Sequence, residues 1–267
     1  MGGIIQHGGT MLGSARCAEF KTDDGRARAL GTLRGHGVDA LVVIGGGGSQ
    51  TGSLALSRLG FPVVGVASTI DNDLVGSDMT IGADTALNIA LEAMDRLKVT
   101  ASSHRRAALV EVMGRDCGYL ALMTALAGGA VAVTIPESPL SPEALAEKLQ
   151  AARARGKDHA IAVVAEGAPW NAARLLDWFR AHETRLGFEL RATVLGHVQR
   201  GVDPSAFDRL LATRLAAHAV ERLAAGEAGF VAVWRAGGPA AIPLEICAGR
   251  RAPLPLDLLA LAETLAT

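Results

Sequence analysis

A glycine-rich segment near residue 45 has the composition of a phosphate-binding loop. Four glycines, residues 45–48, and then Ser49 follow the apolar run at residues 41–44. Glycines let the backbone approach a phosphate closely, and amides at a helix N-terminus stabilise its negative charge. The segment lacks the Gly-Lys-Ser/Thr of a Walker loop and the full Gly-x-Gly-x-x-Gly pattern. Because a flexible turn with Ser49 as helix cap is the alternative, this loop alone favours phosphate binding only slightly.

A second polar loop, residues 68–73, follows the apolar run at residues 62–66. Its carboxylates Asp71 and Asp73 are two positions apart, so that one could accept a proton from a substrate hydroxyl while the other holds Mg²⁺. In isolation, an Asx-type turn explains the pattern better. A glycine-rich and an acidic loop at two successive strand ends instead favour phosphoryl transfer, because donor phosphates, metal and base must converge there.

Arginine and histidine side chains in later loops could bind a phosphorylated substrate. The guanidinium fork suits a phosphate, and histidine can hydrogen-bond the same group. A single loop arginine is more often an ordinary surface residue, but four lie near predicted strand edges: Arg106, Arg115, Arg191 and Arg200. His197 stands close to the last of them. Glu166 follows the apolar run at residues 160–165, where it could bind sugar hydroxyls or start a helix.

Apolar runs of strand length alternate with segments of helical period along the chain. The predicted strands are residues 41–44, 62–66, 107–112, 130–135, 160–165, 192–195 and 229–234. The predicted helices are the stretch after Ser49 to Leu59, residues 86–97, a helix that starts at Pro142, and residues 208–223. This alternation predicts an α/β fold with a mostly parallel sheet covered on both faces, in which ligands bind beyond the carboxyl ends of strands.

The composition excludes several classes of protein. Hydrophobic residues make up 49% of the 267, so the chain can fill a large core and intrinsic disorder is excluded. A net charge of -1 and a single tyrosine argue against nucleic acid as a partner. The longest mostly apolar stretch, residues 122–135, is shorter than the about 20 residues of a membrane-spanning helix. The start lacks the features of a secretory signal, and three cysteines without zinc-like spacing favour a cytoplasmic protein.

Taken in their order along the chain, these loops resemble those of the bacterial, ATP-dependent 6-phosphofructokinase family. The matching stretches are residues 8–16, 41–49, 69–73, 103–106, 110–115, 191–200 and 207–209. Together they extend from about residue 3 to about residue 235, which is far more specific than the glycine loop alone. The resemblance implies two interleaved three-layer lobes with mostly parallel sheets. It also implies transfer of the ATP γ-phosphoryl group to the 1-hydroxyl of fructose 6-phosphate, which gives fructose 1,6-bisphosphate in glycolysis.

The resemblance further implies roles for individual residues. Asp71 would take the hydroxyl proton, and Thr69 and Arg115 would steady the transferring group. Asp73 would lie near Mg²⁺. The implied ATP contacts are Arg16, also a catalytic candidate, with Cys17, Gly46, Gly47, Gly48 and Ser49. The implied sugar-phosphate contacts are Thr69, Asp71, Arg106, Met113, Gly114, Arg115, Glu166, Arg191, His197 and Arg200.

The implied assembly is a homo-oligomer, in this family usually a tetramer. Arg106 and Arg191 would reach the sugar phosphate from a neighbouring subunit. Within one chain, residues 1–82 and 199–247 would form the nucleotide lobe, and residues 83–198 and 248–267 the sugar-phosphate lobe. The chain starts downstream of the strand and Gly-Gly-Asp nucleotide loop with which family members begin, which predicts an N-terminally truncated nucleotide lobe.

The sequence departs from the family pattern at three single positions. Gly47 replaces an aspartate associated with the magnesium, which should weaken the handling of Mg-ATP. Val202 replaces the second glycine of the usual Gln-Arg-Gly-Gly. Val131 stands where regulated members carry a glutamate that binds the effector's metal, which puts control by ADP or phosphoenolpyruvate in doubt. The basic residues of that effector site are matched by Lys98, Arg155, Lys157 and His159.

Pyrophosphate-using relatives differ from this chain at two positions beside the phosphate loops. They carry a second aspartate in the glycine loop and a lysine before the Thr-Ile-Asp-Asn-Asp motif. This chain has Gly48 and Ser68 there, which favours ATP as the donor.

Two other functions are compatible with parts of the sequence. A non-catalytic or weakly active paralogue would bind sugar phosphate and regulate or assemble with a full-length kinase. A dehydrogenase would use the glycine loop for a dinucleotide, although no acidic residue is convincingly placed about 20 residues further on.

Overall fold

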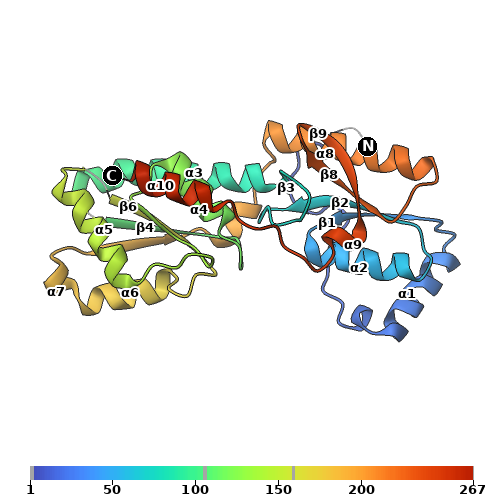
Figure 1. Cartoon of the computed structure of the whole chain (residues 1–267), viewed down its shortest axis with the longest axis horizontal. Helices are drawn as coiled ribbons and strands as arrows, with labels where there is room; N and C mark the ends of the chain where they lie inside the picture. The colour runs from blue at the N-terminus through green and yellow to red at the C-terminus, as the bar shows by residue number, and fades with distance from the viewer. Residues whose placement is uncertain (1–2, 105–106, 158–159, 267) are drawn as a thin grey trace. The chain divides into compact units, whose positions relative to one another are not determined.

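A computed structural model describes residues 3–104, 107–157 and 160–266, without the side chains of residues 100–104. The chain divides into two compact units, each built from two separate stretches of sequence. Unit 1 comprises Met1–Ala83 and Asp203–Pro253, and unit 2 comprises Asp84–Val202 and Leu254–Thr267. Each unit contains a mostly parallel sheet with helices, so the predicted α/β class is confirmed (Figure 1). The nucleotide and sugar-phosphate roles of the two lobes stay predictions.

The sheet of unit 1 has the order β1-β2-β8-β9, with β3 paired to β2. Its strands are β1 (Leu41–Gly45), β2 (Val63–Thr69), β3 (Ile81–Gly82), β8 (Phe230–Arg235) and β9 (Gly238–Pro243). β1, β3 and β8 run parallel to β2, and β9 is antiparallel to β8. Gly45 pairs with Ala67, so the strand ends that precede the glycine-rich and acidic loops lie side by side.

Helices cover both faces of the unit 1 sheet because the buried strand β2 is apolar on both faces. The helices are η1 (Glu19–Lys21), α1 (Asp23–Gly35), α2 (Gly47–Arg58), α8 (Ala206–Ala224) and α9 (Leu244–Cys247). Val64 and Val66 pack with Leu215 of α8 on one face. Val63 packs with Leu30 of α1 on the other face, where α2 also lies. Burying one such side chain contributes about 1.5–3 kcal/mol.

Unit 2 holds an all-parallel sheet of order β5-β6-β4-β7. Its strands are β4 (Ala107–Val112), β5 (Ala132–Thr134), β6 (Ala160–Ala165) and β7 (Leu190–Val194). Its helices are α3 (Ala83–His104), α4 (Tyr119–Gly128), α5 (Pro142–Ala154), α6 (Ala172–Ala181), α7 (Glu183–Leu186), η2 (Gly196–Arg200) and α10 (Leu256–Leu265). Helices α3, α4 and α10 lie over one face of the sheet and α5 and α6 over the other (Figure 1).

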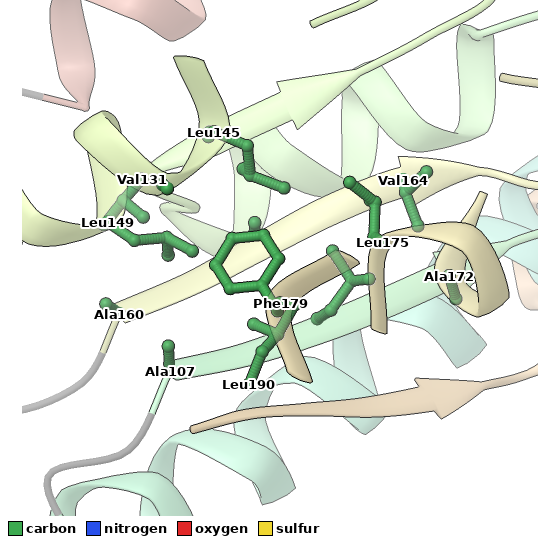
Figure 2. Close-up of a cluster of buried hydrophobic side chains, with 14 of the residues drawn as sticks. Ala107, Val131, Leu145, Leu149, Ala160, Val164, Ala172, Leu175, Phe179 and Leu190 are labelled. Atoms are coloured by element: carbon green, nitrogen blue, oxygen red, sulfur yellow. The ribbon is translucent and has the colours of Figure 1, made fainter. Parts of the chain in front are cut away.

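The core between the unit 2 sheet and helices α5 and α6 combines several strand alanines with large helix residues such as Leu149, Leu175 and Phe179. Figure 2 shows Leu149 and Phe179 pointing from the two helices toward the strand residues Ala160 and Ala107. Alanines on the strands let the helices approach closely, and Ser141 starts α5 by accepting a hydrogen bond from the amide of Ala144. This core fixes the helices against the sheet whose strand ends carry the loops of unit 2.

The last helix, α10, returns to pack on α4 and β5 of unit 2. Beyond it, the carbonyl oxygen of Ala266 accepts hydrogen bonds from Nη2 of Arg155 (3.0 Å) and Nζ of Lys157 (2.9 Å). These are two of the basic residues implied for an effector site, and here they bind the chain's own backbone. Val131 is buried, and His159 lies outside the described residues.

The structure corrects several predicted boundaries. β2 continues to Thr69 because Ser68 and Thr69 pair with β3, so both residues belong to a strand rather than to the predicted polar loop. β5 covers only residues 132–134 of the predicted 130–135. The sequence prediction missed α1, α4, α6, α10 and the edge strand β9, whose glycine and prolines are more typical of turns. Among the described residues, no helix is both long and apolar enough to cross a bilayer.

Candidate active-site loops

The glycine-rich loop of unit 1 connects β1 to α2 and leaves the start of the helix uncapped. Gly46 is the N-cap residue and makes no side-chain capping hydrogen bond. The alternative explanation, a flexible turn with Ser49 as helix cap, does not hold, because Ser49 is already the third helical residue. First-turn amides lack intrahelical partners, so Gly47, Gly48 and Ser49 present N–H groups that an anion can accept.

The glycine-rich loop lies against the end of β2. A Cβ atom on Gly46 would be 3.1 Å from Cβ of Thr69 and 3.5 Å from the carbonyl oxygen of Ser68. Such a distance is tight for any larger residue, so glycine at this position permits the close approach. Unit 1 therefore brings together the two loops that the sequence singles out.

Gln50 fixes the start of α2 to the strand ends. Its side chain is fully buried, and its Nε2 donates to the carbonyl oxygen of Gly45 at 2.9 Å and, at 3.4 Å, to those of Val43 and Val66. Gly65 is required beside it, since a Cβ atom there would lie 2.1 Å from Gln50 Oε1. The sequence analysis missed Gln50; the available signal was a polar residue one position after Ser49, at the start of an amphipathic helix.

The acidic loop is braced by two side chains that the sequence analysis did not select. Thr80 is fully buried, and its hydroxyl donates to the carbonyl oxygen of Thr69 at 2.7 Å. Asn72 has a positive φ of 48°, and its Oδ1 accepts from the amide of Thr80 at 2.8 Å. Asparagine tolerates the left-handed region better than most residues. The amide of Asp71 in turn donates to Oγ1 of Thr69 at 3.2 Å, which shapes the turn that carries the carboxylate.

Asp73 is held at the end of this loop by the segment that follows α9. Its carbonyl oxygen accepts from the amide of Ala252 at 2.8 Å, and its Oδ2 lies 3.7 Å from Nε of Arg251. The Asp73 side chain is 18% exposed. The neighbouring guanidinium limits the directions in which the Asp73 carboxylate can point. A carboxylate oxygen is a ligand that Mg²⁺ prefers.

In unit 2, the loop after β4 is held from two sides. The amide of Met113 donates to Oε1 of Gln199 at 2.7 Å, and the amide of Arg115 donates to Oε1 of Glu166 at 2.9 Å. The amide of Glu166 donates back to the carbonyl oxygen of Val112 at 2.9 Å. Three of the predicted sugar-phosphate residues are thereby joined in one hydrogen-bonded cradle: Met113, Arg115 and Glu166.

Two residues of the cradle have backbone conformations that few residues adopt. Gly114 has a φ of 141° and Arg115 a φ of 52°. A Cβ atom on Gly167 would lie 1.7 Å from the carbonyl oxygen of Arg115, so only glycine fits there. Unusual φ values in a non-glycine residue persist where surrounding contacts fix them, and they are frequent at ligand sites.

The η2 segment carries two further predicted sugar-phosphate residues of unit 2, His197 and Arg200. His197 and Arg200 are exposed, whereas Gln199 between them is buried. Arg191 lies on the edge strand β7, is exposed, and pairs with Glu189 through an Nη2–Oε1 contact of 2.8 Å.

A sequence model of the family described as Phosphofructokinase matches residues 1–223. The chain belongs to the phosphofructokinase family. This membership confirms the resemblance seen in the sequence and removes the dehydrogenase alternative.

Individual relatives of this chain are also phosphofructokinases. It is 51% identical to the ATP-dependent 6-phosphofructokinase 1 of Thermus thermophilus over 265 aligned residues. These residues cover 98% of this chain and 81% of that protein. The crystal structure of Pichia pastoris phosphofructokinase in the T-state superposes with a TM-score of 0.84 at 34% identity, over 98% of this chain and 29% of the longer yeast chain. The structure of a pyrophosphate-dependent phosphofructokinase from Marinobacter aquaeolei superposes with a TM-score of 0.79 at 26% identity. The match covers 93% of this chain and 68% of that chain.

Three predicted site residues of this phosphofructokinase-family chain are not joined to the others. Arg16 and Cys17 are exposed in the coil before η1, and no hydrogen bond or ion pair within the described part of the chain links them to the glycine-rich loop. Arg106 lies outside the described residues. Their roles stay predictions.

The carboxylates of unit 1 fit a magnesium ion that takes most of its oxygen ligands from a nucleotide. Over the described residues, no group of three or more His, Cys, Asp or Glu side chains could hold a metal ion. Mg²⁺ is usually bound through one or two carboxylates plus phosphate oxygens and water, and Asp73, with Asp71 in the same loop, has the chemistry that such an ion takes. Gly47 offers no side chain to such an ion.

Proposed function

We propose that this chain transfers the γ-phosphoryl group of ATP to the 1-hydroxyl of fructose 6-phosphate. The observation that carries the proposal is the 51% identity, over 98% of the chain, to a protein named ATP-dependent 6-phosphofructokinase 1. The pyrophosphate-dependent relative is only 26% identical, which supports ATP as the donor.

In this proposal, unit 1 binds the nucleotide. The uncapped start of α2 gives amide N–H groups for the ATP phosphates, and Gln50 holds that start against the strand ends. Asp71 accepts the proton of the 1-hydroxyl while that oxygen forms a bond to the γ-phosphorus and the bond to ADP breaks. The hydroxyl of Thr69 and the side chain of Arg115 steady the transferring group. Such a reaction depends mainly on positioning and charge neutralisation.

Magnesium, when bound, neutralises charge on the β- and γ-phosphates. Asp73 is the residue that would hold it, and Arg251 helps to orient that carboxylate. Because Gly47 has no side chain, the ion would take more of its ligands from the nucleotide than it would in a site where that position carries a carboxylate.

Unit 2 binds the sugar phosphate in this proposal. Arginine supplies paired hydrogen bonds to a phosphate, which suits Arg200 and, from a neighbouring subunit, Arg106 and Arg191. His197 hydrogen-bonds the same group, and Glu166 accepts from sugar hydroxyls with the carboxylate oxygen that Arg115 does not occupy. The enzyme would act in the cytoplasm as a homotetramer, with the two arginines crossing the interface.

The test is Mg-ATP-dependent formation of fructose 1,6-bisphosphate by the purified chain. Removing the base by Asp71→Ala should lower kcat by about 10²–10⁴-fold, because general base catalysis contributes that much. Asp39→Ala, an exposed carboxylate of the same unit, is the matched control and should leave the rate unchanged. An active Asp71→Ala variant, or a wild-type chain with no product at high enzyme concentration, contradicts the proposal.

The non-catalytic alternative is not favoured, because the similar relatives are named as enzymes. It predicts fructose 6-phosphate binding without ATP binding. Calorimetry with each ligand separates the two functions, and ATP binding in the presence of Mg²⁺ counts against the alternative.

A further inference from the structure

Gln199 is a buried polar residue within an exposed segment. It is 1% exposed, whereas His197, Val198 and Arg200 on either side are exposed. A buried side-chain amide costs free energy unless its donor and acceptor both find partners. Gln199 meets that requirement, and both of its partners are backbone groups of other segments.

The two hydrogen bonds of Gln199 join three separate parts of unit 2. Its Oε1 accepts from the amide of Met113 at 2.7 Å, in the loop after β4. Its Nε2 donates to the carbonyl oxygen of Ala86 at 3.3 Å, in the first turns of α3. One planar amide therefore connects η2, the β4 loop and α3, and it uses a donor on one side and an acceptor on the other.

This connection is one of the side-chain hydrogen bonds to backbone amides of the β4 loop that join it to other segments. Arg115 is tied to Glu166, and Met113 is tied to Gln199. Gly114 lies between them at a φ of 141°, and a glycine backbone has more conformational freedom than other residues if either hydrogen bond is lost. The Met113 tie is the one that links this loop to the segment carrying His197 and Arg200.

We propose that Gln199 is a positioning residue that sets the β4 loop against the η2 segment, so that both present a single site to a phosphorylated sugar. The inference rests on the proposed function, since it assigns the sugar phosphate to these two segments. Gln199 acts through Met113 and through its own backbone, and it does not itself contact the substrate. A displacement of about 1 Å in a positioning contact can lower a rate about 10²-fold.

The decisive variant is Gln199→Met, which keeps the side-chain length and removes both hydrogen bonds. The affinity for fructose 6-phosphate, measured by calorimetry, should fall and its KM should rise by about 10–100-fold. The KM for ATP should stay at the wild-type value. Hydrogen–deuterium exchange of the Met113 amide should become faster, because that N–H loses its acceptor. Gln199→Asn, which keeps the amide on a shorter side chain, should lie between wild type and Gln199→Met, and it replaces that variant if the latter does not fold.

Two controls separate positioning from general destabilisation. Leu175→Ala removes a fully buried side chain from the unit 2 core and should lower Tm at least as much, without weakening fructose 6-phosphate binding. Gln50→Met removes the corresponding buried glutamine of unit 1 and should raise the KM for ATP while sparing sugar-phosphate affinity.

The outcomes separate this inference from the proposed function. A wild-type chain that neither turns over nor binds fructose 6-phosphate overturns both. An active wild type with unchanged fructose 6-phosphate affinity in Gln199→Met overturns the inference alone. Equal losses in Gln199→Met and Leu175→Ala also overturn it, because the effect would then be general.

Discussion

Gly167 is the position where one added methyl group should disturb the hydrogen-bonded cradle of Met113, Arg115 and Glu166 most. Its Cβ atom would lie 1.7 Å from the carbonyl oxygen of Arg115 and 2.8 Å from the carbonyl carbon. Real Cβ atoms do not come closer than 3.0 Å, so Gly167→Ala must separate the two segments by about 1.3 Å. Both contacts are backbone atoms, which cannot rotate away as a side chain would.

The expected result follows from where the displacement falls. Arg115 is bound through its amide to Glu166, directly before Gly167, so the movement pulls that hydrogen bond apart. We expect kcat/KM for fructose 6-phosphate to fall by about 10²-fold, as for other displacements of this size. The free energy of unfolding should fall by about 1–3 kcal/mol, the usual cost of overpacking. The KM for ATP should not change, because the altered segments belong to unit 2.

Steady-state kinetics with each substrate varied, together with urea unfolding, measure these effects. Gly31→Ala is the matched control: it adds the same methyl group to a helical glycine of α1 with nothing within 4 Å, and it should leave the kinetics unchanged. A Gly167→Ala variant with wild-type kcat/KM would refute the argument, since the cradle would then tolerate the shift without consequence for the substrate.

Three other predictions concern unit 1. Gly47→Asp, whose new Cβ enters open space, should lower the Mg²⁺ concentration needed for half-maximal rate, because it adds a carboxylate beside the nucleotide; titration with Mg²⁺ at fixed ATP measures this. Thr80→Val should cost about 1–3 kcal/mol of unfolding free energy and lower kcat, because the carbonyl of Thr69 loses its buried donor; urea unfolding and kinetics test it. Burial raises the pKa of the Cys247 thiol to about 11, so at pH 8 a thiol reagent should modify the exposed Cys17 and leave Cys247 intact until the protein unfolds, as mass spectrometry would show.

The fold and the order of the loops were predictable because they rest on strong local patterns. The runs at residues 41–44, 107–112 and 160–165 are apolar and strand-sized, and they form β1, β4 and β6 with almost the predicted bounds. β9 was not predictable in this way, because it forms by pairing along β8 although its own residues favour turns. β9 forms through its pairing with β8, and its local sequence contains no pattern that predicts a strand.

The candidate site shows the same division. Residues whose side chains have an evident chemistry, such as the carboxylate of Asp71 and the guanidinium of Arg115, could be selected from the sequence as candidates. Thr80 and Gln199 could not, because each acts by hydrogen-bonding backbone groups of another segment. Gln50 offered one local signal, its place directly after Ser49 at a helix start, but its hydrogen-bond partners are visible only in the fold. Gln199 lies 86 residues from Met113, so only the folded chain shows the connection.

The return of α10 to unit 2 has a consequence for how the chain can fold during synthesis. Unit 1 takes β8 and α8 from residues after 203, and unit 2 takes α10 from residues after 254. The Arg155 and Lys157 side chains bind a carbonyl oxygen 111 and 109 residues further on. At about 5–20 residues per second, a ribosome has therefore made most of the chain before either sheet receives its last covering helix. We expect early intermediates to expose apolar sheet faces until then, which makes nascent chains of this protein substrates for chaperones.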